Sequence, residues 1–176
     1  MSAAPGRSPA SSHRSPPGEG RPVSAHTADV QPVHSTADTG MRAFLGLRFV
    51  AVERDGIRMR LEMQPHHLNQ GGTLHGGVLT SMIDIACAVA VRARVDGAPP
   101  GPQEPAPKAS QPIVTLTLNT AFLGSVASGP VTVFARQRGG GQRIRFVAAE
   151  VFDAQNRLIA TGDGSYTLRS RVPAAD

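Results

Sequence analysis

The sequence is poor in aromatic residues and in cysteine, and each scarcity excludes something. It contains six Phe, one Tyr and no Trp, so Val, Leu, Ile and Ala must fill the interior. The stacking aromatics of an RNA-binding signature are missing, as is the pattern of a zinc finger. Cys87 is the only cysteine, which excludes an intramolecular disulfide and fits a reducing compartment.

Long apolar runs are missing too. No stretch reaches the roughly 18 apolar residues of a membrane span, and the N-terminus lacks an apolar run of signal-peptide length. The formal net charge is +5, but the arginines are spread along the chain instead of forming a basic block. We therefore expect a cytoplasmic protein that binds neither a membrane nor nucleic acid.

The first 40 residues differ in composition from the rest. They are rich in Ser, Pro, Gly and Ala and show no helical or strand periodicity, so they cannot offset the entropy of ordering by burying apolar surface. We predict a disordered tail over residues 1–40 and a single folded domain over residues 41–172. A second irregular segment, residues 96–111, contains five Pro and two Gly and is a candidate lid.

The folded part combines many strands with one long helix. A short helix is expected over 41–47, and the almost continuously apolar run 78–91 predicts a buried helix, because it is too long for a typical strand. The expected strands lie at 48–53, 56–63, 113–123, 131–138, 142–152 and 158–168. The first two form a hairpin, and we predict that the last four form a meander. The fold class is α+β, an antiparallel β-sheet wrapped around one central hydrophobic helix.

Asp84 is the only charged residue between His75 and Arg92. Placing a carboxylate on so apolar a helix is costly unless the group is hydrogen-bonded or functional. A desolvated carboxylate is also a stronger base than a free one. Asp84 is therefore a candidate catalytic group, and the alternative is a narrow exposed stripe on the helix or a pairing with an arginine.

Gly76 and Gly77 stand where this helix begins. The first N–H groups of a helix have no intrahelical partner, and glycine lets an acyl group approach them closely. Together with the positive end of the helix dipole, these groups predict an oxyanion site. A flexible turn without a ligand is the alternative.

The surrounding segment resembles a known family. Asn69 is followed six residues later by His75-Gly76-Gly77 and, seven residues beyond the second Gly, by Asp84. This spacing is similar to that of the hotdog-fold acyl-CoA thioesterases of the phenylacetic-acid-degradation (PaaI-like) type. The resemblance implies a hotdog fold and hydrolysis of an acyl-coenzyme A thioester without a cofactor.

The resemblance also implies roles. Asp84 would activate the attacking water or attack the thioester carbon itself, and the Gly76 N–H would bind the carbonyl oxygen, with Gly77 as a neighbouring substrate contact. Asn69 and His75 would orient the acyl and thiol portions of the substrate.

A further role falls on the strand after the helix, where the family commonly places a Ser or Thr that holds the water. Thr115 is the candidate for this position. Thr117 is the alternative, because period two on a strand would point it the same way.

Helix geometry adds a constraint on the site. Gly77 and Asp84 share a helical face but lie about 10 Å apart along the axis. One carbonyl can hardly contact both at reaction distance. We therefore predict that Gly76 of one subunit works with Asp84 of another, as is also usual in the resembling family, in a homo-oligomer expected to be a dimer of dimers, a homotetramer.

Four arginines flank the triple-glycine turn at 139–141. They are Arg136, Arg138, Arg143 and Arg145. By period two the first pair shares one strand face and the second pair shares one on the next strand. Such a cluster suits the phosphates of coenzyme A, with Arg138, Gly140 and Arg143 as candidate contacts, and a solvated hairpin is the alternative.

The remaining histidines and the cysteine are weaker candidates for a metal site or a nucleophile. His66, His67 and His75 lack a metal spacing and a carboxylate partner set, so we predict no metal. Cys87 is expected to be a small core residue instead of a nucleophile, and His75 taken alone suits a helix cap.

Two alternative functions stay open: an enoyl-CoA hydratase in which His75 faces Asp84, and a non-catalytic acyl-CoA-binding module. The acyl group is not specified.

Overall fold

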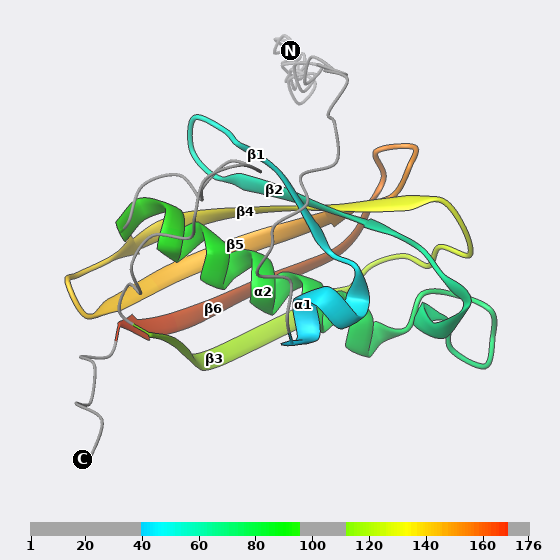
Figure 1. The fold of residues 1–176 in the computed structure, drawn as a ribbon, viewed down its shortest axis with the longest axis horizontal. Helices are drawn as coiled ribbons and strands as arrows, with labels where there is room; N and C mark the ends of the chain where they lie inside the picture. The colour runs from blue at the N-terminus through cyan, green and yellow to red at the C-terminus, as the bar shows by residue number, and fades with distance from the viewer. Residues whose placement is uncertain (1–39, 96–111, 169–176) are drawn as a thin grey trace, which may run out of the picture.

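A computed structural model describes residues 40–95 and 112–168 (Figure 1). The tail predicted over residues 1–40 lies outside the described residues except for Gly40, which begins the first helix. The candidate lid at 96–111 lies outside them as well.

The order of elements agrees with the sequence pattern. The first part of the chain forms α1 (Gly40–Leu45), β1 (Arg48–Val52), β2 (Ile57–Glu62), the 3-10 turn η1 (Pro65–His67) and α2 (Gly76–Val95). The second part forms β3 (Ile113–Phe122), β4 (Pro130–Gly140), β5 (Ile144–Phe152) and β6 (Leu158–Leu168). Helix α2 begins two residues earlier and ends four residues later than its apolar run predicts.

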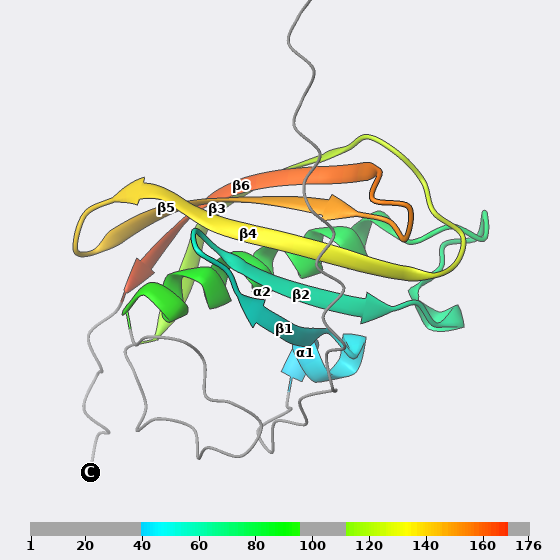
Figure 2. The same cartoon turned by 90° about the horizontal axis from the view of Figure 1, so that it is seen from above.

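The six strands form one antiparallel sheet in the order β1-β2-β4-β5-β6-β3 (Figures 1 and 2). Strands β4, β5 and β6 form a meander, but the prediction that β3 joins it at β4 is wrong. The other edge of β4 is occupied by β2, so β3 pairs with β6 at the far side of the sheet. Both β1 and β3 are therefore edge strands.

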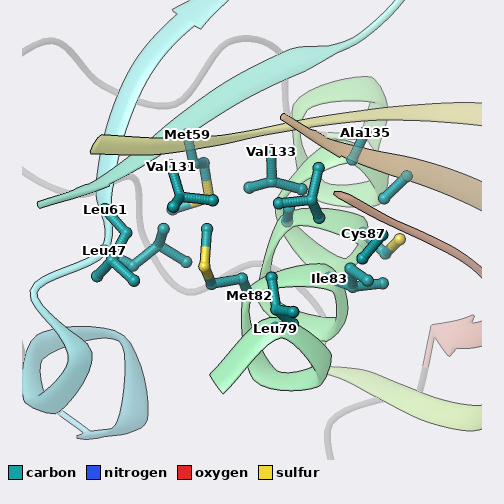
Figure 3. Close-up of a cluster of buried hydrophobic side chains, with 14 of the residues drawn as sticks. Leu47, Met59, Leu61, Leu79, Met82, Ile83, Cys87, Val131, Val133 and Ala135 are labelled. Carbon is teal, nitrogen blue, oxygen red and sulfur yellow. The ribbon is translucent and has the colours of Figure 1, made fainter. Parts of the chain in front are cut away.

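Helix α2 runs along one face of this sheet (Figure 2). Its buried residues recur at intervals of three and four, which defines the face that packs on the strands. They are Leu79, Met82, Ile83, Ala86, Cys87, Ala90 and Val91. Figure 3 shows Met82 and Leu79 among aliphatic and Met side chains from β2 and β4. No helix within 40–95 or 112–168 is long and apolar enough to cross a membrane.

Two glycines of β6 let α2 and β3 approach the strand closely. A Cβ at Gly162 would stand 2.6 Å from Cγ2 of Ile83 and 2.9 Å from the carbonyl oxygen of Asn119, and a Cβ at Gly164 would stand 2.6 Å from the carbonyl oxygen of Thr117. Real Cβ atoms do not approach this closely. The absence of side chains at these glycines thus allows α2 to lie close to β6. Because Asp84 follows Ile83 in α2, the same close packing brings Asp84 near β6.

Candidate active site

Asp84 projects from the middle of α2 towards β3 and β6. Its Oδ1 accepts a hydrogen bond from Thr115 Oγ1 at 2.8 Å and another from the Tyr166 hydroxyl at 3.1 Å. Thr115 and Tyr166 are cross-strand partners on β3 and β6, so their side chains lie on the same face of the sheet. The half-buried carboxylate is thus hydrogen-bonded, which is the condition under which burial of a charge is tolerated.

Tyr166 is the site residue that the sequence analysis missed. Its side chain is fully buried, and burial raises the pKa of its hydroxyl far above the ordinary value, with Cys87 and Asp84 adding to the effect. Tyr166 therefore keeps its proton and acts as a donor. Two signals in the sequence point to it: it is the only tyrosine, and it shares the period-two face of Gly162 and Gly164 on β6.

Cys87 lies beside this group and has no exposed surface. Burial raises the pKa of its thiol to about 12, although an interaction with the Tyr166 hydroxyl opposes the change. A buried thiol with so high a pKa is a poor nucleophile. The expectation that Cys87 is a small core residue is confirmed.

A β-bulge in β3 separates the two threonine candidates. Thr115 pairs with Tyr166 and Thr117 pairs with Ser165, so Leu116 is an extra residue between them. A bulge of this kind reverses the alternation of side chains. Thr117 accordingly forms a hydrogen bond of 2.8 Å with Ser165 Oγ, and the prediction that it points the same way as Thr115 is wrong.

Thr115 therefore contacts the carboxylate directly. A hydroxyl has a single proton, and that of Thr115 is donated to Asp84. Thr115 is left able to bind a water only as an acceptor. Its predicted role of holding the water stays a prediction.

Asn69 organises the exposed loop before α2. Its Oδ1 accepts the N–H groups of Gly71 at 2.9 Å and Thr73 at 3.2 Å, and its Nδ2 donates to Thr73 Oγ1 at 3.0 Å. The backbone of Asn69 also donates to the carbonyl of Thr73 at 2.8 Å. These bonds give Asn69 a structural task, and its predicted contact with a substrate stays a prediction.

His75 caps α2. Its Nδ1 accepts the N–H of Gly77 at 2.8 Å, and its carbonyl accepts those of Val78 at 2.9 Å and Leu79 at 3.2 Å. The capping role considered for His75 is thus realised. Because Nδ1 is an acceptor here, the proton of a neutral imidazole sits on Nε2. Gly77, predicted as a substrate contact, has its N–H engaged by His75.

The N–H of Gly76 differs from the others in the first turn of α2. Among the hydrogen bonds of the described residues, none uses this N–H, whereas the next three N–H groups all bond to His75. A Cβ at Gly76 would lie 3.3 Å from the ring of Phe122, a residue of β3 that is 54% exposed. Within the described residues, the Gly76 N–H is thus left without a hydrogen-bond acceptor and lies next to an exposed aromatic ring, and its predicted role as oxyanion donor stays a prediction.

The arginines around the triple-glycine turn are divided between the two faces of the sheet. Arg136 and Arg138 line one shallow hollow, and Arg136 forms an ion pair of 3.6 Å with Asp55. Arg145 instead pairs in register with Tyr166 on β6, which places it on the face that carries α2. Arg143 is exposed and precedes β5.

Gly140 closes this hairpin with a φ of 117°, and a Cβ there would collide with the carbonyl of Ile144. The turn interpretation of the triple glycine therefore holds for Gly140. The hairpin lies at the end of the sheet near the last turn of α2, opposite the Gly76 end (Figure 1).

The architecture and the helix start together define a class of protein. An antiparallel sheet with one long helix on its face, a glycine-rich helix start and a carboxylate in mid-helix are the features of a hotdog-fold thioesterase. A family model described as the thioesterase superfamily matches residues 71–160, just over half of the chain. The chain belongs to the thioesterase superfamily, which supports hydrolase activity.

Individual relatives agree with this assignment. A candidate esterase of Mycobacterium tuberculosis is 30% identical over 118 residues, covering 67% of this chain and 78% of the relative. Its solved structure is similar with a TM-score of 0.62 at 26% identity, covering 75% of this chain and 98% of that one.

Two further structures share the fold at 19% identity. Thioesterase HI1161 of Haemophilus influenzae has a TM-score of 0.65 and covers 77% of this chain and 86% of its own. The PaaI protein of E. coli, from the phenylacetic acid degradation operon, has a TM-score of 0.61 and covers 73% of this chain and 83% of its own. The predicted hotdog fold and thioesterase class are confirmed.

Proposed function

We propose that this protein is an acyl-CoA thioesterase that hydrolyses its substrate by carboxylate-assisted attack of water. The observation that carries the proposal is the hydrogen bonding of Asp84: two hydroxyls occupy Oδ1, and Oδ2 is left for the reaction. A carboxylate held in this way on a buried helix is suited to general base catalysis. The lone Cys87 fits a cytoplasmic location, which is part of the proposal.

The proposed reaction balances as follows. Oδ2 of Asp84 takes a proton from water while the water oxygen attacks the thioester carbon. The carbonyl oxygen becomes an oxyanion, which the Gly76 N–H stabilises. Collapse of this intermediate breaks the C–S bond, and the departing thiolate takes the proton from Asp84. The products are a free acid and coenzyme A.

A nucleophilic route gives the same products. Asp84 would attack the carbon itself, expel the thiolate and form an anhydride that water then hydrolyses. A single turnover in H₂¹⁸O separates the two routes. Direct attack by water places ¹⁸O in the product acid, whereas water that attacks the Asp84 carbonyl of the anhydride places ¹⁸O in the protein, and the product acid keeps an unlabelled oxygen from Asp84.

The proposal requires two subunits for one site. Gly76 and Asp84 are eight residues apart on α2, about 12 Å along its axis, whereas reacting atoms must lie about 3 Å apart. We therefore assign Gly76 of one copy and Asp84 of a second copy to the same site in a homo-oligomer, as a dimer or a dimer of dimers. Support comes from β3, an edge strand that carries Thr115 and has an exposed Leu116 within it and an exposed Leu123 just after it.

Subunit mixing tests this arrangement. We expect Gly76→Pro and Asp84→Ala to be inactive separately, because each damages every site. In a mixed dimer one site carries both changes and the other carries neither, so random mixing should restore about a quarter of wild-type activity. No recovery in verified mixed oligomers would contradict the shared site.

The hairpin between β4 and β5, with Arg138 and Arg143 on either side of its turn, is proposed to bind the phosphates of coenzyme A. Arg138 and Arg143 are exposed, and Gly140 shapes the turn between them. Two copies related by a two-fold axis beside β3 would bring the hairpin end of one towards the Gly76 end of the other. Arg143→Ala should raise KM for an acyl-CoA and leave KM for a pantetheine-shortened substrate unchanged; equal effects on both substrates would contradict the assignment.

A thiol-release screen over short-chain, medium-chain and aromatic acyl-CoAs tests the activity itself. We expect at least one substrate to release coenzyme A, and Asp84→Asn to slow the release about 10²- to 10⁴-fold. Addition of water to an enoyl-CoA without release of thiol would favour a hydratase. Binding of acyl-CoAs with no turnover would favour a binding module.

A further inference from the structure

Tyr166 carries an inference that rests on the proposed function and goes beyond it. We propose that Tyr166 is a positioning residue that, together with Thr115, orients Asp84 so that Oδ2 is the only carboxylate oxygen that reacts. The resemblance assigned no role to this tyrosine.

The hydrogen bonds of the carboxylate distinguish its two oxygens. Each carboxylate oxygen has about two lone-pair sites, and both sites of Oδ1 are occupied, by Thr115 at 2.8 Å and Tyr166 at 3.1 Å. Among the hydrogen bonds of the described residues, none reaches Oδ2. The proton of the attacking water therefore goes to Oδ2, and Oδ1 is fixed.

The two donors differ in how firmly they are held. Thr115 lies on an edge strand next to a bulge and is exposed. Tyr166 lies on β6, which is paired on both sides, by β3 and by β5, and its side chain has no exposed surface. The Cβ that Gly164 lacks would lie 3.1 Å from Cε2 of the ring. The tyrosine is thus the rigid reference against which the carboxylate is oriented.

The chemistry of the surroundings fixes the direction of the bond. Burial raises the pKa of the Tyr166 hydroxyl most, and Cys87 and Asp84 raise it further. Tyr166 consequently donates to Asp84 and does not compete with it as a base. Donation to a charged acceptor in a partly buried site is among the stronger hydrogen bonds in proteins.

The test is Tyr166→Phe, which removes the hydroxyl and keeps the ring. We expect kcat for an acyl-CoA to fall about 10- to 100-fold, as for a small misplacement of a catalytic group, with KM unchanged. The matched control is Thr117→Val, because that hydroxyl lies across the bulge and bonds to Ser165; its kcat should stay within about twofold of wild type. A merely structural role would instead lower the thermal midpoint and change KM as well.

A mutant cycle shows whether Tyr166 acts through Asp84. In an Asp84→Asn background, Tyr166→Phe should change the residual rate by less than about twofold, because the group it positions no longer takes a proton. A full loss in that background, or normal kcat in Tyr166→Phe alone, would overturn the inference and leave the proposed function standing. A wild-type protein that releases no thiol would overturn the proposed function, and the role of Tyr166 with it.

Discussion

The two halves of the proposed site are held in place in different ways. At the start of α2, Asn69 and His75 shape the backbone through exposed side-chain hydrogen bonds to residues two to four positions away. In the middle of α2, Asp84 is held by donors that are 31 and 82 positions away in the chain. The local half consists of Asn69, His75 and the Gly76 N–H, and its side chains are solvent-exposed. The assembled half consists of Asp84 with Thr115 and Tyr166, and it depends on the folded sheet.

The two halves are therefore suited to different chemical roles. The helix start offers a backbone N–H, which the local loop can present without help from the core. The carboxylate must be desolvated and oriented, which only packing against two strands provides. Changes to the packing around the carboxylate should therefore lower activity and stability together, whereas the helix start can lose its backbone N–H with the fold preserved.

The largest effect is expected at Asp84. Asp84→Asn keeps an oxygen that can accept from Thr115 and Tyr166 but removes the ability to take a proton. We expect kcat to fall about 10²- to 10⁴-fold with little change in the urea midpoint, as measured by thiol release and by denaturation. Activity within tenfold of wild type would contradict a catalytic role for Asp84.

The next effect tests the backbone donor of the local half. Proline is tolerated at the first position of a helix, and Gly76 is not among the residues with positive φ. Gly76→Pro therefore removes the N–H while the helix start is preserved. We expect kcat to fall about 10²- to 10³-fold, the usual cost of losing an oxyanion donor.

Gly76→Ala is the matched control for this prediction. It places a Cβ at the same 3.3 Å from the Phe122 ring but keeps the N–H. Its kcat should exceed that of the proline variant by at least about tenfold. Equal losses in the two variants would assign the effect to steric contact with Phe122 and remove Gly76 from the oxyanion role.

The same division explains what could be predicted from the sequence. The helix start was predictable because capping and free N–H groups depend on neighbours within a few residues, as His75 shows. The place of β3 was not, because which edge of the sheet is free depends on β2, far away in the chain. The bulge at Leu116 leaves no trace in the apolar pattern, so Thr115 and Thr117 were indistinguishable. Tyr166 was missed because its partner is 82 positions away.

A substitution on β6 beneath α2 should disturb the position of Asp84 without replacing any residue of the proposed site. Gly162→Ala places a Cβ 2.6 Å from Cγ2 of Ile83, so α2 must move away from β6. This movement also increases the distance between Asp84 and Tyr166. We expect a loss of about 1–3 kcal/mol in the free energy of unfolding together with a lower kcat. Gly124→Ala, where the Cβ meets Ile159 at an ordinary 3.4 Å, should change neither, and equal losses in both variants would contradict the close-packing explanation.

The smallest effect separates the two roles of His75. His75→Ala removes the acceptor for the Gly77 N–H and should cost about 1 kcal/mol of unfolding free energy, the usual value of a helix cap. Asn is a good capping residue, so His75→Asn should recover the stability, as measured by urea denaturation. If the imidazole Nε2–H also contacts the substrate, KM stays raised in both variants, because neither side chain reproduces that donor at the same reach. Recovery of KM along with stability in His75→Asn would make His75 a helix cap alone and remove it from the predicted substrate contacts.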